Sequence, residues 1–231
     1  MSTYGRRREI LESMYVALLS HFGPSRWWPA KTPFEVALGA ILTQNTAWNN
    51  VEKALVGLDS VTGLIPDEVA ALSVPLLEDA IRPAGFFRQK SKKIRAFLRL
   101  LDEHGGMGNG ERDVALECFR SVGDGALRER LLAVSGIGPE TADCILLYAL
   151  DRPFFVVDAY TRRIFGRHGL VPDDMDYAGL QEFFMDALPH DRALFNEYHA
   201  LIVRAGKDFC RKTKPRCGEC PLGNFLEYAP E

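Results

Sequence analysis

Three cysteines near the C-terminus are the first residues whose type and spacing could do chemistry. Cys210, Cys217 and Cys220 form the pattern C-x6-C-x2-C, and they are three of the five cysteines in the chain. Thiolates grouped in this way bind zinc or an iron–sulfur cluster, and a structural site of either kind normally has four protein ligands. No cysteine follows Cys220 in this sequence, so these residues supply three ligands and a fourth is missing.

The second candidate is a tight glycine turn between two predicted helices. Gly136, Ile137 and Gly138 follow a helical pattern that ends near Ser135, and Pro139 is typical of the first turn of the next helix. Glycines permit a sharp turn, and uncovered amides at a helix N-terminus bind anions with the help of the helix dipole. The turn therefore predicts a site for a DNA phosphate, and an ordinary corner between helices is the alternative.

Two carboxylates follow this turn. Glu140 lies in the first turn of the second helix, and Asp158 directly follows the apolar run 154–157. A fixed carboxylate can stabilise positive charge that develops in a transition state, and it can orient a water molecule. For Asp158 the alternative is a helix N-cap, and one side chain can fill both roles.

Together these segments resemble a known family, the helix-hairpin-helix DNA glycosylases of the endonuclease III superfamily. The family's hairpin and its apolar run ending in V-D correspond to LLAVSGIGPETA (131–142) and VVDAYTRR (156–163). AILTQNT (40–46) and AGFFRQKSKKI (84–94) match two further segments, and the C-terminal cysteines match the family's cluster spacing. The matches follow the family's order over residues 34–220.

The resemblance implies roles for single residues. Asp158 matches the catalytic aspartate, which stabilises an oxocarbenium-like sugar during cleavage of the N-glycosidic bond. Glu140 stands where bifunctional members carry a lysine that forms a Schiff base with C1′ of the sugar. A glutamate cannot form this bond, so the resemblance implies a monofunctional glycosylase without AP lyase activity.

The resemblance also implies which residues contact double-stranded DNA. Gln44 matches a polar wedge that fills the gap left by a flipped-out nucleotide, and a polar residue at a helix end is the alternative. The hairpin residues implied to bind the DNA backbone are Gly136, Ile137, Gly138 and Thr141.

A base pocket is expected from three tryptophans and one lysine: Trp27, Trp28, Trp48 and Lys207. The segment RWWPAKTPFE (26–35) and Trp48 resemble the 3-methyladenine branch of the superfamily. An alkylated purine such as 3-methyladenine is cationic, and the face of an indole attracts a cation. The alternatives are that Trp27 and Trp28 only pack between lobes and that Lys207 is solvated.

The cofactor expectation follows from the same resemblance. In the family a fourth cysteine completes the [4Fe–4S] ligands after a spacer of five residues, and Leu226 stands at that position here. We therefore expect an incomplete or labile cluster at Cys210, Cys217 and Cys220. Zinc with an outside ligand and an empty relic of the site are open alternatives.

The elements that must position these residues are almost all helices. Apolar residues recur at helical spacing along most of the chain, and FFVV (154–157) is too short and isolated to form a sheet. Helices are expected near residues 10–22, 33–44, 48–58, 73–81, 87–104, 112–121, 124–134, 139–150, 158–168, 176–187 and 191–206, with a short one from residue 66.

The implied fold is all-α and two-lobed, with a DNA-binding cleft between the lobes. The resemblance places a six-helix barrel over residues 33–153 and a second domain over residues 1–32 plus 154–231. The net charge of −3 argues weakly against a nucleic-acid-binding protein. However, basic stretches at 82–99 and 204–216 are typical of a surface that contacts a polyanion, with solvated helix ends as the alternative.

Length and composition exclude several other classes. A chain of 231 residues, 47% hydrophobic and 26% charged, is neither disordered nor a disulfide-rich mini-protein. No apolar run is long enough for a membrane span, and the N-terminus lacks the pattern of a secretory signal. We expect a monomeric cytoplasmic protein that acts on the chromosome.

Competing functions stay open within this frame. A bifunctional endonuclease III-type glycosylase/AP lyase and an adenine-mismatch glycosylase are the enzymatic alternatives. Glu140 argues against the first, and the absence of a second, mismatch-recognising domain from this sequence argues against the other. A non-catalytic DNA-damage binding protein on the same scaffold is the alternative from another class, and Asp158 argues against it.

Overall fold

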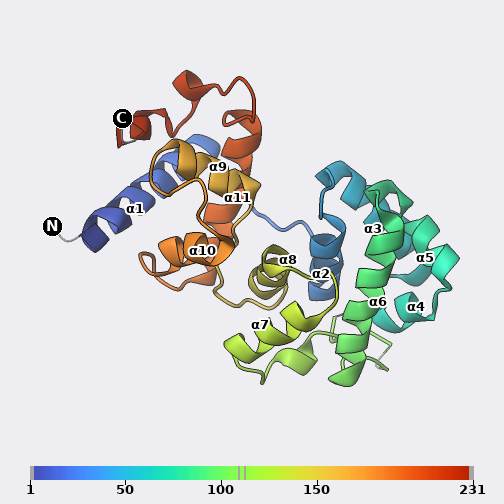
Figure 1. Cartoon of the computed structure of the whole chain (residues 1–231). Helices are drawn as coiled ribbons and strands as arrows, with labels where there is room; N and C mark the ends of the chain where they lie inside the picture. The colour runs from blue at the N-terminus through green and yellow to red at the C-terminus, as the bar shows by residue number, and fades with distance from the viewer. Residues whose placement is uncertain (1–2, 109, 112, 229–231) are drawn as a thin grey trace. The chain divides into compact units, whose positions relative to one another are not determined.

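The computed structural model describes residues 3–108, 110–111 and 113–228, and these residues fold into helices joined by turns and loops (Figure 1). No β-strand occurs within these ranges, so the predicted all-α class is confirmed. The α-helices are α1 (Thr3–Phe22), α2 (Pro33–Leu42), α3 (Trp48–Thr62), α4 (Pro66–Ala71), α5 (Val74–Ala80), α6 (Phe87–Glu103), α7 (Asp124–Ala133), α8 (Pro139–Cys144), α9 (Ala159–Arg167), α10 (Tyr177–Met185) and α11 (Arg192–Asp208).

The chain divides into two compact units. One comprises Trp28–Arg152, and the other combines Met1–Trp27 with Pro153–Glu231. The first therefore holds the helices from α2 to α8, and the second holds α1 and α9 to α11. The DNA-binding cleft that the resemblance implies stays a prediction.

The helix α2 lies at the centre of the unit Trp28–Arg152. Eight of its ten residues are buried, as expected for a helix enclosed by neighbours, and it packs against α3, α6 and α8. Its start agrees with the sequence pattern, because Thr32 Oγ1 accepts a hydrogen bond from the amide of Glu35 (3.1 Å) and Pro33 is the first helical residue.

The end of α2 comes earlier than residue 44. The helix stops at Leu42, and the hydroxyl of Thr43 donates to the carbonyl of Gly39 (2.6 Å). Asn45 then adopts a left-handed backbone (φ 52°), which a continuing helix does not permit. Gln44 therefore belongs to a turn and not to the helix itself.

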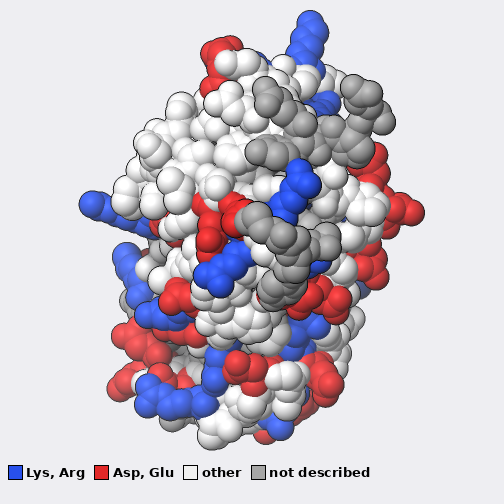
Figure 2. All heavy atoms as spheres, turned by 90° about the vertical axis from the view of Figure 1, so that its left-hand side faces the viewer, with Lys and Arg blue, Asp and Glu red and all other residues white. Residues whose placement is uncertain are grey.

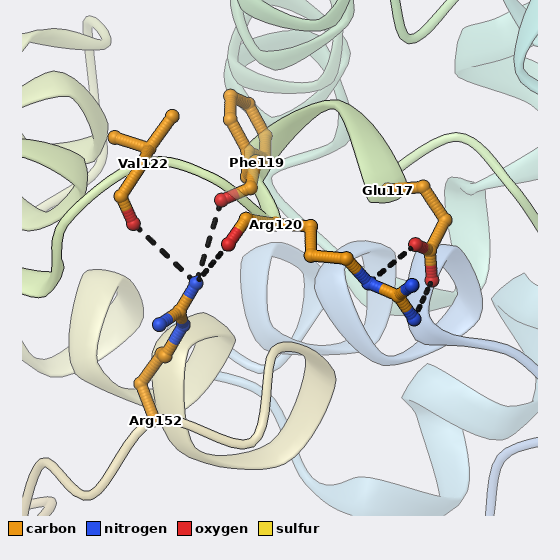
Figure 3. A network of polar contacts seen from close by, with 5 residues as sticks. All are labelled: Glu117, Phe119, Arg120, Val122 and Arg152. Atoms are coloured by element: carbon orange, nitrogen blue, oxygen red, sulfur yellow. Dashed lines mark hydrogen bonds and ion pairs between the residues drawn. The ribbon is translucent and has the colours of Figure 1, made fainter.

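The helix expected over residues 112–121 is wrong for the part of this segment that the structure describes; residue 112 lies outside it. The segment holds only the 3₁₀ turn Glu117–Phe119 (Figure 3). Nη2 of Arg152 donates to the carbonyls of Phe119 (3.4 Å), Arg120 (3.0 Å) and Val122 (3.4 Å). Donors from outside the segment therefore bind carbonyls at its end that a continuing helix would pair with its own amides.

The helix expected over residues 139–150 is two elements. The α-helix α8 ends at Cys144, and one π-helical turn, Ile145–Ala149, follows it. The amide of Arg152 then donates to the carbonyl of Leu146 (2.8 Å), which ends the helical path.

The second unit is built on buried aromatic side chains. The ring of Phe155 stacks on that of Phe184 from α10, with ring centroids 4.0 Å apart, and the hydroxyl of Tyr198 joins α11 to α1 by donating to the carbonyl of Leu11 (2.9 Å). Residues 154–157 belong to no helix or strand in the described ranges. Instead, Gln181 Nε2 donates to the carbonyl of Phe155 (2.7 Å).

Candidate active site and DNA-binding elements

Asp158 is the N-cap of α9. Its Oδ1 accepts hydrogen bonds from the amide (2.7 Å) and the hydroxyl (2.9 Å) of Thr161, and its side chain is 12% exposed. These bonds fix the carboxylate and engage Oδ1, while Oδ2 takes no part in them. A capping role and a catalytic role are therefore compatible at this residue.

His199 of α11 is a neighbour of Asp158 that sequence analysis missed. Its Nε2 lies 3.8 Å from Asp158 Oδ2, and its side chain is 8% exposed. Burial lowers the pKa of His199 below its usual value of 6.5, although Asp158 opposes the shift. The imidazole is therefore neutral at neutral pH and leaves the charge of Asp158 in place. A single histidine in an apolar helix gives no signal that separates it from an ordinary core residue.

The predicted hairpin joins α7 to α8 and turns at Gly136, whose φ of 88° favours glycine. The amides of the exposed Gly136 and Gly138 have no acceptor among the described residues, so both can bind an anion. The amide of Ile137 instead donates to the carbonyl of Val134 (3.0 Å), and its side chain is buried. Ile137 therefore supports the turn from inside.

An ion pair holds the two helices that flank the hairpin. The guanidinium of Arg128 on α7 binds the fully buried carboxylate of Asp143 on α8 through two hydrogen bonds of 2.7 and 3.0 Å. A bidentate pair of this kind is geometrically specific, so it fixes the angle at which the chain enters and leaves the turn.

Gln44 is bound to the hairpin. Its Nε2 donates to the carbonyl of Gly136 (3.2 Å) and to the hydroxyl of Thr141 (2.8 Å), and Lys93 Nζ donates to its Oε1. The stem of Lys93 also packs on the turn, because a Cβ at Gly136 would lie 2.6 Å from Lys93 Cγ. Thr141, a predicted DNA contact, is buried and serves as the acceptor for Gln44.

Trp28 and Trp48 lie together in the unit Trp28–Arg152. Their ring centroids are 5.1 Å apart with the planes at 86°, and the ring of Tyr148 lies 5.2 Å from Trp28. Gly39 of α2 makes room for this cluster, since a Cβ there would approach Trp28 Cζ2 to 3.0 Å. Three segments that are distant in sequence therefore form one aromatic cluster.

The other two base-pocket candidates belong to the second unit. Trp27 precedes the boundary between the units and is half-buried, and Lys207 is exposed in the last turn of α11. Glu140, in the first unit, is exposed in the first turn of α8.

Phe86 is a surface aromatic that sequence analysis passed over. It precedes α6, is 65% exposed, and has a left-handed backbone (φ 45°) after Gly85. The available signal was the pair of adjacent aromatic residues in AGFFRQK, because two consecutive residues cannot both face the same buried side of a helix.

The three C-terminal cysteines line one small cavity with Leu226. Its volume is about 20 Å³, which is room for roughly one water molecule. Arg167 Nη1 donates to Cys210 Sγ (3.2 Å), and burial raises the pKa of the Cys220 thiol. Within the described ranges no group of three or more His, Cys, Asp or Glu side chains is arranged to hold a metal ion. The residues present therefore do not fit a four-thiolate cluster.

The basic side chains of the two stretches lie in different environments. In the first, Lys90 is buried, Arg82 pairs with Asp79 (2.9 Å), and Arg95 donates to the carbonyl of Leu72. In the second, Arg216 pairs with Glu219. Figure 2 shows one face of the molecule, on which acidic and basic side chains are interspersed. No helix in the described part of the chain combines the length and hydropathy needed to cross a bilayer.

The fold and this set of residues define a class of protein. A family model described as "HhH-GPD superfamily base excision DNA repair protein" matches residues 38–190, which is more than half of the chain. The chain belongs to this superfamily, and it is a DNA glycosylase of the endonuclease III-like, helix-hairpin-helix type.

Particular relatives refine this assignment. A Methanocaldococcus jannaschii protein provisionally named a DNA repair glycosylase is 42% identical over 221 residues, covering 94% of this chain and 96% of the relative. Endonuclease III of Thermotoga maritima is 30% identical over 201 residues, covering 85% and 83%.

Solved structures show the same architecture. The H. pylori 3-methyladenine DNA glycosylase bound to 1,N6-ethenoadenine superposes with a TM-score of 0.69 at 29% identity, covering 87% of this chain and 97% of that one. A non-covalent endonuclease III–DNA complex superposes with a TM-score of 0.77 at 22% identity, covering 99% and 97%.

Proposed function

We propose that the protein is a monofunctional DNA N-glycosylase that flips an alkylated purine, such as 3-methyladenine, out of double-stranded DNA and hydrolyses its N-glycosidic bond. Asp158 would stabilise the positive charge that develops on the sugar and orient the attacking water. The product would be an intact strand with an abasic site. Its place of action would be the chromosome.

The observation that carries the monofunctional part is Glu140. It is exposed in the first turn of α8, beside the hairpin, at the position where the family resemblance expects the lysine of a lyase. A carboxylate cannot form a Schiff base with C1′, so strand cleavage through this residue is chemically excluded. Its negative charge near the hairpin also suits a cationic base better than a lysine would.

The aromatic cluster supports an alkylated purine as the substrate. The rings of Trp28 and Trp48 are nearly perpendicular, so their π faces point in two directions. A cationic base stacked on an indole gains about 1–2 kcal/mol beyond the contact itself when water is excluded. The likeness to the H. pylori 3-methyladenine glycosylase supports the same choice.

One assay separates this proposal from its alternatives. Duplexes that each carry a single lesion (3-methyladenine, thymine glycol or adenine opposite 8-oxoguanine) are incubated with the protein and analysed with and without alkali. We expect strand breaks only after alkali, and only with the alkylated base. Breaks without alkali would identify a lyase, and protein-bound but uncut DNA in both conditions would identify a binding protein.

Borohydride trapping tests the chemistry directly. Because Glu140 cannot form an imine, the protein should give no covalent adduct with lesion-containing DNA under reducing conditions. An adduct mapped to a lysine would overturn the monofunctional proposal. Lys207 and Lys93, which contacts Gln44, are the positions to sequence first.

A further inference from the structure

Lys90 is a buried lysine on α6 whose three donors are all used. The residue is 2% exposed, and its Nζ donates to the carbonyl of Leu42 (2.7 Å), the hydroxyl of Thr46 (2.5 Å) and the carbonyl of Ala84 (2.8 Å). An ammonium carries three protons, so this set matches it completely. Burial, with a smaller effect from Lys93, lowers the pKa of Lys90 to about 8, so the group is still mainly charged at neutral pH.

The acceptors belong to two loops that are distant in sequence. Leu42 is the last residue of α2, Thr46 lies in the turn that follows it, and Ala84 ends the 3₁₀ turn Arg82–Ala84. The hydroxyl of Thr46 also donates to the carbonyl of Ala84 (2.6 Å), so it accepts from Lys90 and donates across to the second loop. The carbonyl of Leu42 at the end of α2 lacks a helical donor, and a cation there is favourable.

Gln44 in the first loop and Phe86 in the second are the side chains suited to contact DNA, and each loop contains a residue with a left-handed backbone. Asn45, directly before Thr46, has a φ of 52°, and Phe86, two residues after Ala84, has a φ of 45° and is 65% exposed. Left-handed backbone at residues other than glycine is strained, so the surroundings must hold it. Gln44, next to Asn45, is itself bound to the hairpin.

We propose that Lys90 is a positioning residue that holds the loops 43–47 and 82–86 at a fixed spacing, so that Gln44 and Phe86 enter the DNA duplex already ordered. This inference rests on the proposed function, because it concerns the flipping of a base by that same protein. A preordered pair of loops avoids the loss of conformational freedom that binding would otherwise cost. Lys90 itself contacts no DNA, since its ammonium is enclosed.

The first experiment measures insertion into DNA without any base release. The full chain is saturated with a duplex that contains a tetrahydrofuran abasic analogue beside 2-aminopurine, whose fluorescence rises when it is unstacked. The parent should raise the fluorescence, and Lys90→Met should bind but give a rise on the order of tenfold smaller, because the inserting groups are displaced. Lys53→Met, which removes an exposed lysine from α3 with the same change of charge, should match the parent.

A second variant keeps the test valid if Lys90→Met fails to fold. Thr46→Val removes the hydroxyl that joins the loops and leaves the lysine in place, and it should lower the fluorescence rise in the same direction. A parent-like rise in a folded, DNA-bound variant of either kind would overturn the proposal. Absence of any rise with the parent would also overturn it.

The second experiment compares a lesion that is paired with one that is already extrahelical. In single turnovers, Lys90→Met should release the base from a paired lesion about tenfold to a hundredfold more slowly than the parent, and from a bulged lesion nearly as fast. A merely structural defect would slow both reactions equally, and that result would overturn the proposal. If the parent releases no base from any lesion, the proposed function fails, while the fluorescence measurement still decides the role of Lys90.

Discussion

Asp158 and Gln44 are both partly buried polar side chains beside a helix end, yet different kinds of contact hold them. Asp158 is fixed by Thr161, three residues further along the chain, and lies beside a neutral imidazole. Gln44 is fixed by Gly136 and Thr141, 92 and 97 residues away, and by Lys93.

This difference predicts that substitutions at the two residues have different effects on activity. A carboxylate held by its own helix keeps its position when the rest of the molecule adjusts to DNA. A side chain held by the hairpin and by α6, both distant in sequence, has its position set by the packing of the whole unit. Substitutions at Asp158 should therefore lower the rate of bond cleavage for every lesion. For substitutions in the unit that contains Gln44, the loss of rate should depend on which base is damaged and on whether it is paired.

The largest expected effect is at Asp158. Asp158→Asn keeps an acceptor for Thr161, so α9 should remain capped and duplex binding should persist. Base release should fall by on the order of 10²-fold or more, because the charge that stabilises the transition state is lost. Single-turnover rates and gel-shift binding measure the two properties. A near-parental rate would show that this carboxylate is only a cap.

The aromatic cluster should give the next largest effect. Trp28→Leu and Trp48→Leu retain most of the apolar contact and remove the π face. Release of 3-methyladenine should fall about tenfold for a loss of roughly 1.4 kcal/mol, and release of a neutral base should fall less. The ratio of the two rates is the measurement, since it cancels losses of stability. Equal losses would make the tryptophans structural.

A smaller effect is expected from His199 and appears only at acidic pH. When the pH falls through its lowered pKa, the imidazole becomes a cation 3.8 Å from Asp158 and cancels part of the catalytic charge. Activity should then decline, and His199→Gln should move this decline to lower pH while changing the rate at pH 8 little. A pH–rate profile that is identical in the two proteins would exclude electrostatic coupling between these residues.

The stability of the folded protein should also depend on the protonation of His199. The unfolded chain protonates this imidazole near 6.5, before the folded chain does, so protons favour unfolding. Thermal stability should therefore fall as the pH drops from 6.5 to the folded-state pKa. His199→Gln should remove this component of the pH dependence.

The smallest effect on activity is expected at the cysteine cavity. Its cysteines are distant in sequence from both Asp158 and Gln44. The parent, purified in air, should show little of the brown absorbance of a [4Fe–4S] cluster, because Leu226 replaces the fourth thiolate. Leu226→Cys should raise the iron content if the loop keeps the geometry of a cluster site. About four iron atoms per chain in the parent would refute a lost cluster and indicate an outside ligand.

Sequence alone was sufficient where a feature depends on near neighbours. The N-cap at Asp158, the glycine turn at Gly136 and the start of α2 at Pro33 involve contacts within about four residues, so residue type and spacing predict them. The all-helical class follows for the same reason, because helical periodicity is a local pattern.

Tertiary structure decided the role of each basic residue between 82 and 99. Lys90 lies on the same face of α6 as Ile94 and Phe97, a signal that was available in the spacing, while Lys92 is exposed. The sequence predicted a surface that contacts a polyanion for all of them, with solvated helix ends as the alternative. Lys90 can be buried because the carbonyl of Leu42, 48 residues away, accepts a hydrogen bond from its ammonium.

The other features that the sequence did not predict also depend on contacts between distant residues. At the end of the segment 113–121, where a helix was expected, Arg152, some thirty residues further on, donates to the carbonyls of Phe119 and Arg120. Trp28 meets Trp48, and Gln44 meets the hairpin, only because α3, α6 and α8 each pack against α2. Sequence by itself determined what short-range hydrogen bonding and periodicity impose on the backbone. Packing decided which polar and aromatic side chains share a site, because their partners lie tens of residues away and no local pattern specifies them.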